Sequence, residues 1–206
     1  MTGLILKDLM YLRRTAKVLL LLLAFYFVLF AAAGGDTAAG IFSAVTVMLT
    51  VLLSVNAFAY DEAAKWSVYE RSLPVSKSGV VLARYSLGIV VSTCLTLISF
   101  LAELVILRGV SPDNLTALWV SWSVALLFCA ILFPLMYKYG TQKARMVLMI
   151  VVLLPTLGMI LLQKANLPLP SASAVLLLIR FLPLAAVAVV LISFQVSCRI
   201  FRNKED

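Results

Sequence analysis

Residues 56–85 read NAFAYDEAAKWSVYERSLPVSKSGVVLARY and form a dense polar segment between two apolar runs. The segment holds three acidic and four basic side chains together with one Trp and three Tyr. The whole chain is 64% hydrophobic and only 13% charged. A soluble globular domain carries about 25% charged residues, so this composition indicates a domain that lies in a lipid bilayer. The quoted segment is then a connection between two membrane spans.

Six apolar segments on either side of this connection are candidate membrane spans. A helix that crosses the hydrocarbon core needs about 20 mostly apolar residues. Backbone groups in lipid must be hydrogen-bonded internally, which favours helices for runs of this length. The sequence therefore predicts an all-α integral membrane protein, a single transmembrane domain over residues 1–206 with six transmembrane helices at about 18–34, 38–59, 80–107, 116–137, 146–163 and 174–198.

The distribution of basic residues orients these spans. Fourteen Lys and Arg lie in the leader, in the 56–85 connection, in the connection after the fourth span and in the C-terminal tail. Three lie on the other side, at Arg108, Lys164 and Arg180. Positive residues are retained on the cytoplasmic side of membrane proteins. We therefore expect both termini in the cytoplasm, and the net charge of +8 requires no nucleic-acid partner.

The N-terminal leader has a helical amphipathic pattern. Its apolar residues Ile5, Leu9, Leu12 and Ala16 share one face, while Lys7, Arg14 and Lys17 share the other. Such a helix lies in the headgroup layer of the membrane, so membrane lipid is an expected partner. The Ala31-Ala32-Ala33 run resembles a signal-peptidase site, but the long basic leader and the length of the apolar run favour a retained first span.

Several classes of chemistry lack their residues in this sequence. The chain contains no His, which argues against His-dependent metal sites, triads and dyads. It contains no phosphate-binding GxxxxGK[ST] loop, and its three Cys lie separately within apolar runs. We therefore predict no catalytic residue, no metal site and no cofactor in this chain, which is not expected to be an enzyme.

Two stripes of hydroxyl residues run along predicted spans. Ser92, Thr96, Ser99 and Glu103 share a face of the third span, as do Ser43, Thr46, Thr50 and Ser54 in the second. Such stripes pack neighbouring membrane helices or line a polar path, and both readings stay open. Glu103 follows Arg84 by about 28 Å of helix, which predicts a position near the outer interface for this carboxylate.

The 56–85 connection itself predicts a short surface helix. Asp61 is a candidate N-cap and is spaced for an ion pair with Lys65. Glu62, Trp66, Tyr69 and Glu70 follow at helical spacing, and Leu73-Pro74 ends the helix. Its aromatic residues suit either the headgroup layer or a docking contact with another protein. A catalytic pair of Asp61 and Glu62 is disfavoured, because adjacent helical positions point in different directions.

The leader sequence LILKDL followed by YDEAAKWSVYERSLPVSKSGVVLARY resembles permease subunits of ABC-2 type transporters, including the phenol-soluble-modulin exporter permeases of Gram-positive bacteria. The likeness is specific over residues 56–85, although Lys would be expected where Arg84 stands. It implies a cytoplasmic coupling helix between the second and third spans, in which Asp61, Glu62, Lys65, Trp66, Tyr69 and Glu70 contact a separate ATPase. Residues 72–76 would form the exit into the third span.

The same resemblance implies the remaining functional expectations. The protein would be an ABC exporter permease of the bacterial cell membrane, with amphipathic peptides or other amphiphiles as cargo. Its partners would be a cytoplasmic ABC ATPase subunit, which binds ATP and Mg²⁺, and a second permease subunit that is identical or related. Ser92, Thr96, Ser99 and Glu103 would be the pathway-lining candidates. The alternative function is a membrane assembly or regulatory subunit that transports nothing.

Overall fold

The computed structural model describes residues 7, 21–26, 28–29, 36–66, 69, 76–107, 112–164 and 172–203. These residues form helices and no strand, as the composition predicts. The helices in chain order are α2 (Asp36–Ala63), α4 (Lys77–Leu107), α5 (Pro112–Tyr139), α6 (Thr141–Lys164) and α7 (Ala172–Asn203). The predicted leader helix lies outside the described residues except for Lys7, so its amphipathic character stays a prediction.

Four of these helices are long and apolar enough to cross a membrane. The candidate spans are Ser43–Ala63, Lys77–Val105, Asn114–Tyr139 and Leu177–Asn203. They coincide with the second, third, fourth and sixth predicted spans. The fifth predicted span lies within α6, and residues 21–26 and 28–29 of the first are helical. The total of six spans remains a prediction.

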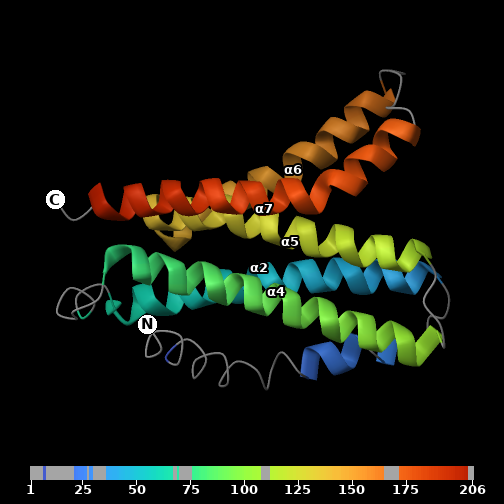
Figure 1. The fold of residues 1–206 in the computed structure, drawn as a ribbon, viewed down its shortest axis with the longest axis horizontal. Coiled ribbons are helices and arrows are strands. Elements are labelled where there is room, and N and C mark those ends of the chain that lie inside the picture. The colour runs from blue at the N-terminus through green and yellow to red at the C-terminus, as the bar shows by residue number, and fades with distance from the viewer. Residues whose placement is uncertain are drawn as a thin grey trace.

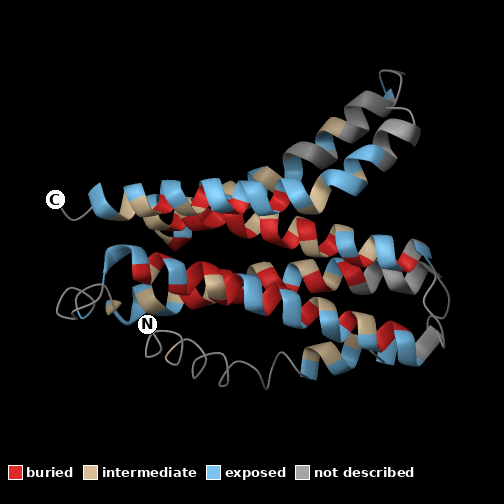
Figure 2. Cartoon of the chain, in the orientation of Figure 1, coloured by how far each residue is buried: buried red, intermediate tan, exposed pale blue. Residues whose placement is uncertain are grey.

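Helix α5 is central in the bundle and packs against α2, α4, α6 and α7 (Figure 1). The main core cluster joins α4, α5 and α7 through Val81, Tyr85, Leu126, Cys129, Ala130, Phe133, Ala186 and Val190. Figure 2 shows buried residues on the inward faces of these helices and exposed residues along the outer side of α7. The exposed residues of α7 include Leu178, Leu184 and Ile192, as expected of a surface that faces lipid.

Proline residues interrupt the hydrogen-bond pattern of two membrane helices without ending them. Pro134 lies inside α5 and Pro183 inside α7. Figure 1 shows α7 bending, so that its N-terminal part diverges from α5 together with α6. A proline removes one backbone donor and displaces the preceding turn, which accounts for a bend of this kind near Pro183.

Candidate functional site

Helix α2 extends further than predicted and includes two of the three acidic residues of the connection, Asp61 and Glu62. It ends at Ala63, where the Ala64 N–H bonds to the Tyr60 carbonyl at 2.9 Å. Lys65 follows with a left-handed φ of 49°, and its N–H bonds to the Glu62 carbonyl at 3.1 Å. Asp61 is therefore in the last turn of α2, and the prediction that it begins a separate helix is wrong.

The chain becomes helical again at Trp66 and Tyr69, after the break at Lys65. The two rings lie 6.3 Å apart between centroids, as neighbours on one helical face do. Residues 67–68 and 70–75 lie outside the described residues, and they include Glu70 and most of the predicted exit segment. The predicted coupling helix therefore stays a prediction in its full length.

Asp61 joins the N-terminal segment to the start of α4. Its carboxylate is 2.8 Å from Lys7 Nζ and also forms an ion pair with Arg84. Arg84 is buried, and its guanidinium carbon lies 5.0 Å from the centre of the Phe58 ring. The predicted Asp61–Lys65 ion pair is wrong, because Lys65 follows the helix end and is exposed, while Asp61 turns toward α4.

Glu62 joins the end of α2 to the start of α6. Its Oε2 accepts a hydrogen bond from the backbone N–H of Thr141 at 3.0 Å and another from the Thr141 hydroxyl. Gly140 separates α5 from α6 with a φ of 80°. The Gly140 N–H bonds to the Met136 carbonyl, and the Gly140 carbonyl accepts from Ala144, so one residue ends α5 and begins α6. The carboxylate thus lies where helix α6 presents unpaired N–H groups and a positive dipole end.

Lys7 adds a further contact at this end of the bundle. Its ammonium group lies 4.1 Å from the centre of the Trp66 ring as well as beside Asp61. We call Lys7, Asp61, Glu62, Arg84 and Thr141 the α2-end cluster. Two adjacent carboxylates in this cluster connect the N-terminal segment, α2, α4 and α6. Sequence reasoning selected Asp61 and Glu62, but it could not find Thr141, which is 79 residues away from Glu62.

Three further predicted coupling residues, Lys65, Trp66 and Tyr69, follow α2 in the chain. Lys65 and Tyr69 are exposed, with 63% of the Tyr69 surface accessible, and Trp66 is half-buried. Lys65 and Tyr69 therefore lie at the surface of the part of the chain that the structure describes. Asp61 is half-buried and Glu62 is exposed, and the carboxylates of both contact other elements of the chain.

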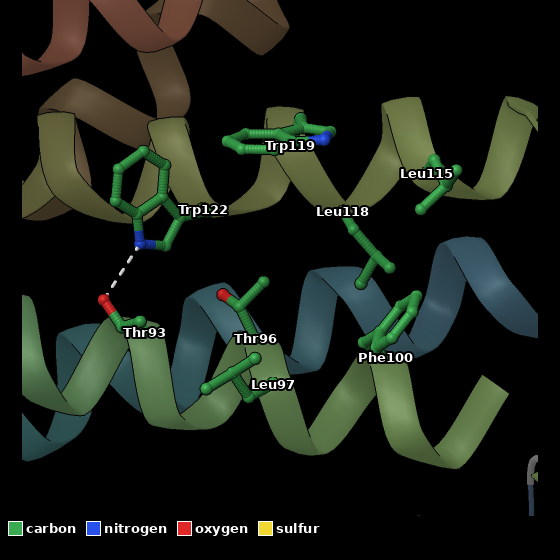
Figure 3. A pocket seen from close by; sticks show the side chains of 8 residues that line it. All are labelled: Thr93, Thr96, Leu97, Phe100, Leu115, Leu118, Trp119 and Trp122. Carbon is green, nitrogen blue, oxygen red and sulfur yellow. Dashed lines mark hydrogen bonds between the residues drawn. The ribbon is translucent and has the colours of Figure 1, made fainter. Parts of the chain in front are cut away.

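The two hydroxyl stripes face the interior of the bundle. Thr46 of α2 and Ser99 of α4 share a hydrogen bond of 2.6 Å, and Ser54 lies 3.5 Å from Cys129 of α5. Ser92 is buried and bonds to the Ile89 carbonyl of its own helix. Thr96 is half-buried and lines a groove between α4 and α5 (Figure 3). A role in lining a translocation path therefore remains a proposal for Ser92, Thr96 and Ser99.

Glu103 is the unexpected member of these stripes. The sequence predicts an interfacial position for it, yet its side chain is 0% exposed within the bundle. Among the described residues, neither of its carboxyl oxygens has a hydrogen-bond partner. Its burial could not be read from spacing alone, because the position follows from how α2 and α5 pack against α4.

A second buried polar group went undetected in the sequence. The Tyr85 hydroxyl of α4 lies 2.6 Å from Ser193 Oγ and 2.8 Å from Ser197 Oγ of α7. Ser193 also donates to the Ala130 carbonyl of α5 at 2.5 Å. The four-residue spacing of the two serines was the available signal, but their partner on α4 was not predictable.

In the part of the chain that the structure describes, no group of His, Cys, Asp and Glu is arranged to hold a metal ion.

Comparison with known proteins identifies one matching family. A family model described as "ABC-2 family transporter protein" matches residues 3–202. No curated protein matches the chain.

Proposed function

The chain belongs to the ABC-2 transporter family, whose model spans nearly its whole length, and on this premise we propose that it is the permease subunit of an ABC exporter. Membership makes it a multi-pass membrane protein and a membrane component of a transporter. A separate ABC ATPase, which binds ATP and Mg²⁺, would supply the energy from the cytoplasm. This sequence does not contain the phosphate-binding loop that such an ATPase needs, which supports ATP hydrolysis on a separate chain.

We place the ATPase contact on the segment that follows α2. Lys65 and Tyr69 are exposed there, and the Trp66 ring lies beside Tyr69. Aromatic and basic side chains of this kind are good anchors in protein interfaces. Glu70 belongs to the same proposed contact on the sequence pattern.

The α2-end cluster would carry movement from this contact into the membrane helices. A push on Trp66 and Tyr69 acts on the last turn of α2, where Asp61 is tied to α4 and Glu62 to α6. The three helices would then shift together when the ATPase subunits close on ATP. The connection of α2, α4 and α6 by two adjacent carboxylates is the observation that carries this proposal.

Two permease subunits, identical or related, would enclose the translocation path. The cargo would be amphipathic peptides or other amphiphiles that enter from the cytoplasmic side, and Ser92, Thr96, Ser99 and Glu103 would lie on the path. The exposed apolar face of α7 would meet membrane lipid or the second subunit. The location would be the bacterial cell membrane, as the resemblance implies, and the charge distribution supports both termini in the cytoplasm.

The experiment is purification of the tagged full chain from native membranes in a mild detergent, with measurement of the ABC ATPase that accompanies it and of its ATP turnover. Tyr69→Ala together with Lys65→Ala should release the ATPase. Phe181→Ala is the matched control, because Phe181 is exposed to 61% on α7 and Tyr69 to 63%. This control should retain the ATPase.

Glu62→Gln separates docking from transmission. This variant should keep the ATPase bound but reduce the response of ATP turnover to the permease, because the Glu62 carboxylate binds Thr141 at the start of α6. If Tyr69→Ala with Lys65→Ala leaves ATPase binding unchanged, the docking assignment is wrong. If no ABC ATPase accompanies the wild-type chain, a membrane assembly or regulatory subunit becomes the better description.

A further inference from the structure

A groove of about 370 Å³ lies between α4 and α5. Nearer the start of α4, the two helices pack closely at Gly88, where an added Cβ would come within 2.9 Å of the Phe133 ring. Further along α4, Trp119 and Trp122 of α5 line the groove. The eight side chains that line the groove are Thr93, Thr96, Leu97, Phe100, Leu115, Leu118, Trp119 and Trp122 (Figure 3).

The groove is apolar and opens on the surface of the bundle. Leu97, Leu115 and Trp119 are exposed, so an apolar chain can enter from the side without crossing the protein. Its polar groups are hydroxyls near one end, where the Trp122 indole N–H points to Thr93 Oγ1 at 3.4 Å (Figure 3). The groove is large enough for the hydrocarbon tail of an amphiphile, since pockets for small ligands begin at about 300 Å³.

Glu103 lies one turn beyond the groove on the same helix. It follows Phe100, which lines the groove, by three residues, and Ser99, which bonds to α2, by four. Residues three and four apart are neighbours on a helix surface, so Glu103 faces the seam between α2 and α5 at the end of the groove. Its side chain is fully buried, and the described residues offer its carboxyl oxygens no partner.

A positive partner would stabilise the ionised form of a buried carboxyl group of this kind. A charged group in hydrocarbon is costly unless it is paired, and acidic residues within spans are normally paired. Here an acid that the described residues leave without a partner adjoins an apolar groove. A ligand that carries both a cationic head and an apolar tail would match the two features at once.

We propose that Glu103 and the α4–α5 groove form a binding site for a cationic amphiphile, with the cationic head at Glu103 and the tail between Phe100 and Trp122. This inference rests on the proposed function and narrows its cargo class from amphiphiles in general to cationic ones. Because Glu103 has no exposed surface, the head reaches it when α4 moves relative to α2 and α5.

Binding in the groove can be followed by Trp fluorescence, because Trp119 and Trp122 line the groove and Trp66 is the one other Trp of the chain. The full chain with Trp66→Phe would be placed in nanodiscs of zwitterionic lipid, without ATPase or nucleotide. Quenching of Trp fluorescence would be measured with a chain-brominated dodecyltrimethylammonium and with an equally brominated dodecyl maltoside. We expect saturable quenching by the cationic probe and a loss of about tenfold or more in its apparent affinity with Glu103→Gln.

Two controls make the result specific. Lys143→Gln changes the charge of the chain by one unit at an exposed position of α6, outside the groove and the α2-end cluster, and should leave the affinity of the cationic probe unchanged. The uncharged maltoside should bind equally to the wild-type chain and to Glu103→Gln. Equal losses for both probes would mean that Glu103 only shapes the groove, and this result would overturn the proposal.

Quenching that follows lipid partition without saturation, or equal affinity of the wild-type chain for both probes, would also overturn it, because ordinary lipid would then be the occupant. Failure of the proposed function is distinguishable, since ATPase association is measured separately. If the chain binds the cationic probe but no ATPase accompanies it, the exporter proposal is wrong and the binding site stands. If an ATPase accompanies the chain but the cationic probe does not bind, only the binding-site proposal is wrong.

Discussion

The Glu62 carboxylate accepts a hydrogen bond from the Thr141 backbone N–H at 3.0 Å, so the last turn of α2 caps the first turn of α6. The contact is made by an acid at the positive end of a helix dipole, which is a favourable place for it. Because the residue that caps α6 belongs to another helix, moving the end of α2 disturbs the start of α6 directly.

Glu62→Ala should destabilise the protein. We expect a loss of about 0.5–2 kcal/mol in the free energy of unfolding, as for removal of a helix N-cap. The measurement is unfolding of the chain in lipid nanodiscs. Lys143→Ala is the control, because it removes an exposed cation from the same first turn of α6. The control should be neutral or slightly stabilising, and an equal loss in both variants would contradict the cap.

Gly140→Ala should destabilise the junction of α5 and α6. The glycine has a φ of 80°, and an added Cβ would lie 3.1 Å from Glu62 Oε1. A left-handed conformation costs a residue with a Cβ about 1–2 kcal/mol. Gly140→Asn should have a smaller conformational cost at the backbone, since Asn adopts the left-handed region more readily than Ala. Thermal unfolding of both variants tests the order, and a fully stable Gly140→Ala would show that the junction adopts another conformation.

Asp61 should matter more through Arg84 than through Lys7. Arg84 is buried, and loss of one partner of a buried ion pair costs about 3–5 kcal/mol, so Asp61→Asn should be strongly destabilising. Lys7 and Asp61 retain 27% and 22% of their side-chain exposure, so solvent screens their pair, and Lys7→Ala should cost less than about 1 kcal/mol. If Asp61→Asn and Lys7→Ala lose similar stability, Asp61 acts mainly through its contact with Lys7 and not through Arg84.

Gly88→Ala should push α4 away from α5. An added Cβ would lie 2.9 Å from Phe133 Cζ, and overpacking of this kind costs about 1–3 kcal/mol. Gly158→Ala is the matched control, because a Cβ there meets nothing within 4 Å. The control should gain up to about 1 kcal/mol from helix propensity. Two variants of equal stability would contradict the close packing at Gly88.

Tyr85→Phe should weaken the attachment of α7 to α4. The change removes the hydroxyl that bridges Ser193 and Ser197, and we expect a loss of about 1 kcal/mol, in the range of hydrogen bonds between membrane helices. Tyr139→Phe removes an exposed hydroxyl at the end of α5 and should change stability little. Unfolding in nanodiscs measures both. A neutral Tyr85→Phe would mean that the two serines satisfy each other without the tyrosine.

The selection of coupling residues from the sequence stays a prediction. Asp61 and Glu62 were selected as partner contacts because they lie in a polar connection, and the structure brings both into contacts within the chain. The helix-start prediction for Asp61 failed because α2 continues by hydrogen bonding up to Ala63, beyond the end of its apolar run. The Trp119 and Trp122 groove was missed, because aromatic residues in an apolar helix carry no signal of the space beside them.

The sequence by itself determined the class of molecule. Apolar runs of bilayer length predict membrane helices, and basic residues concentrated in alternate connections predict their orientation, because both are properties of the local chain and its solvent. The spacing of Ser99 and Glu103 on one face of α4 was likewise readable from helical periodicity.

Only the tertiary structure decided what these residues meet. The pairing of Thr46 with Ser99, of Asp61 with Arg84 and of Glu62 with Thr141 depends on which helices are neighbours and in what register. A stripe of hydroxyls is compatible with any neighbour of suitable shape, so periodicity does not choose one. The same packing buried Glu103 beside an apolar groove, a juxtaposition that arises from the approach of α2, α4 and α5.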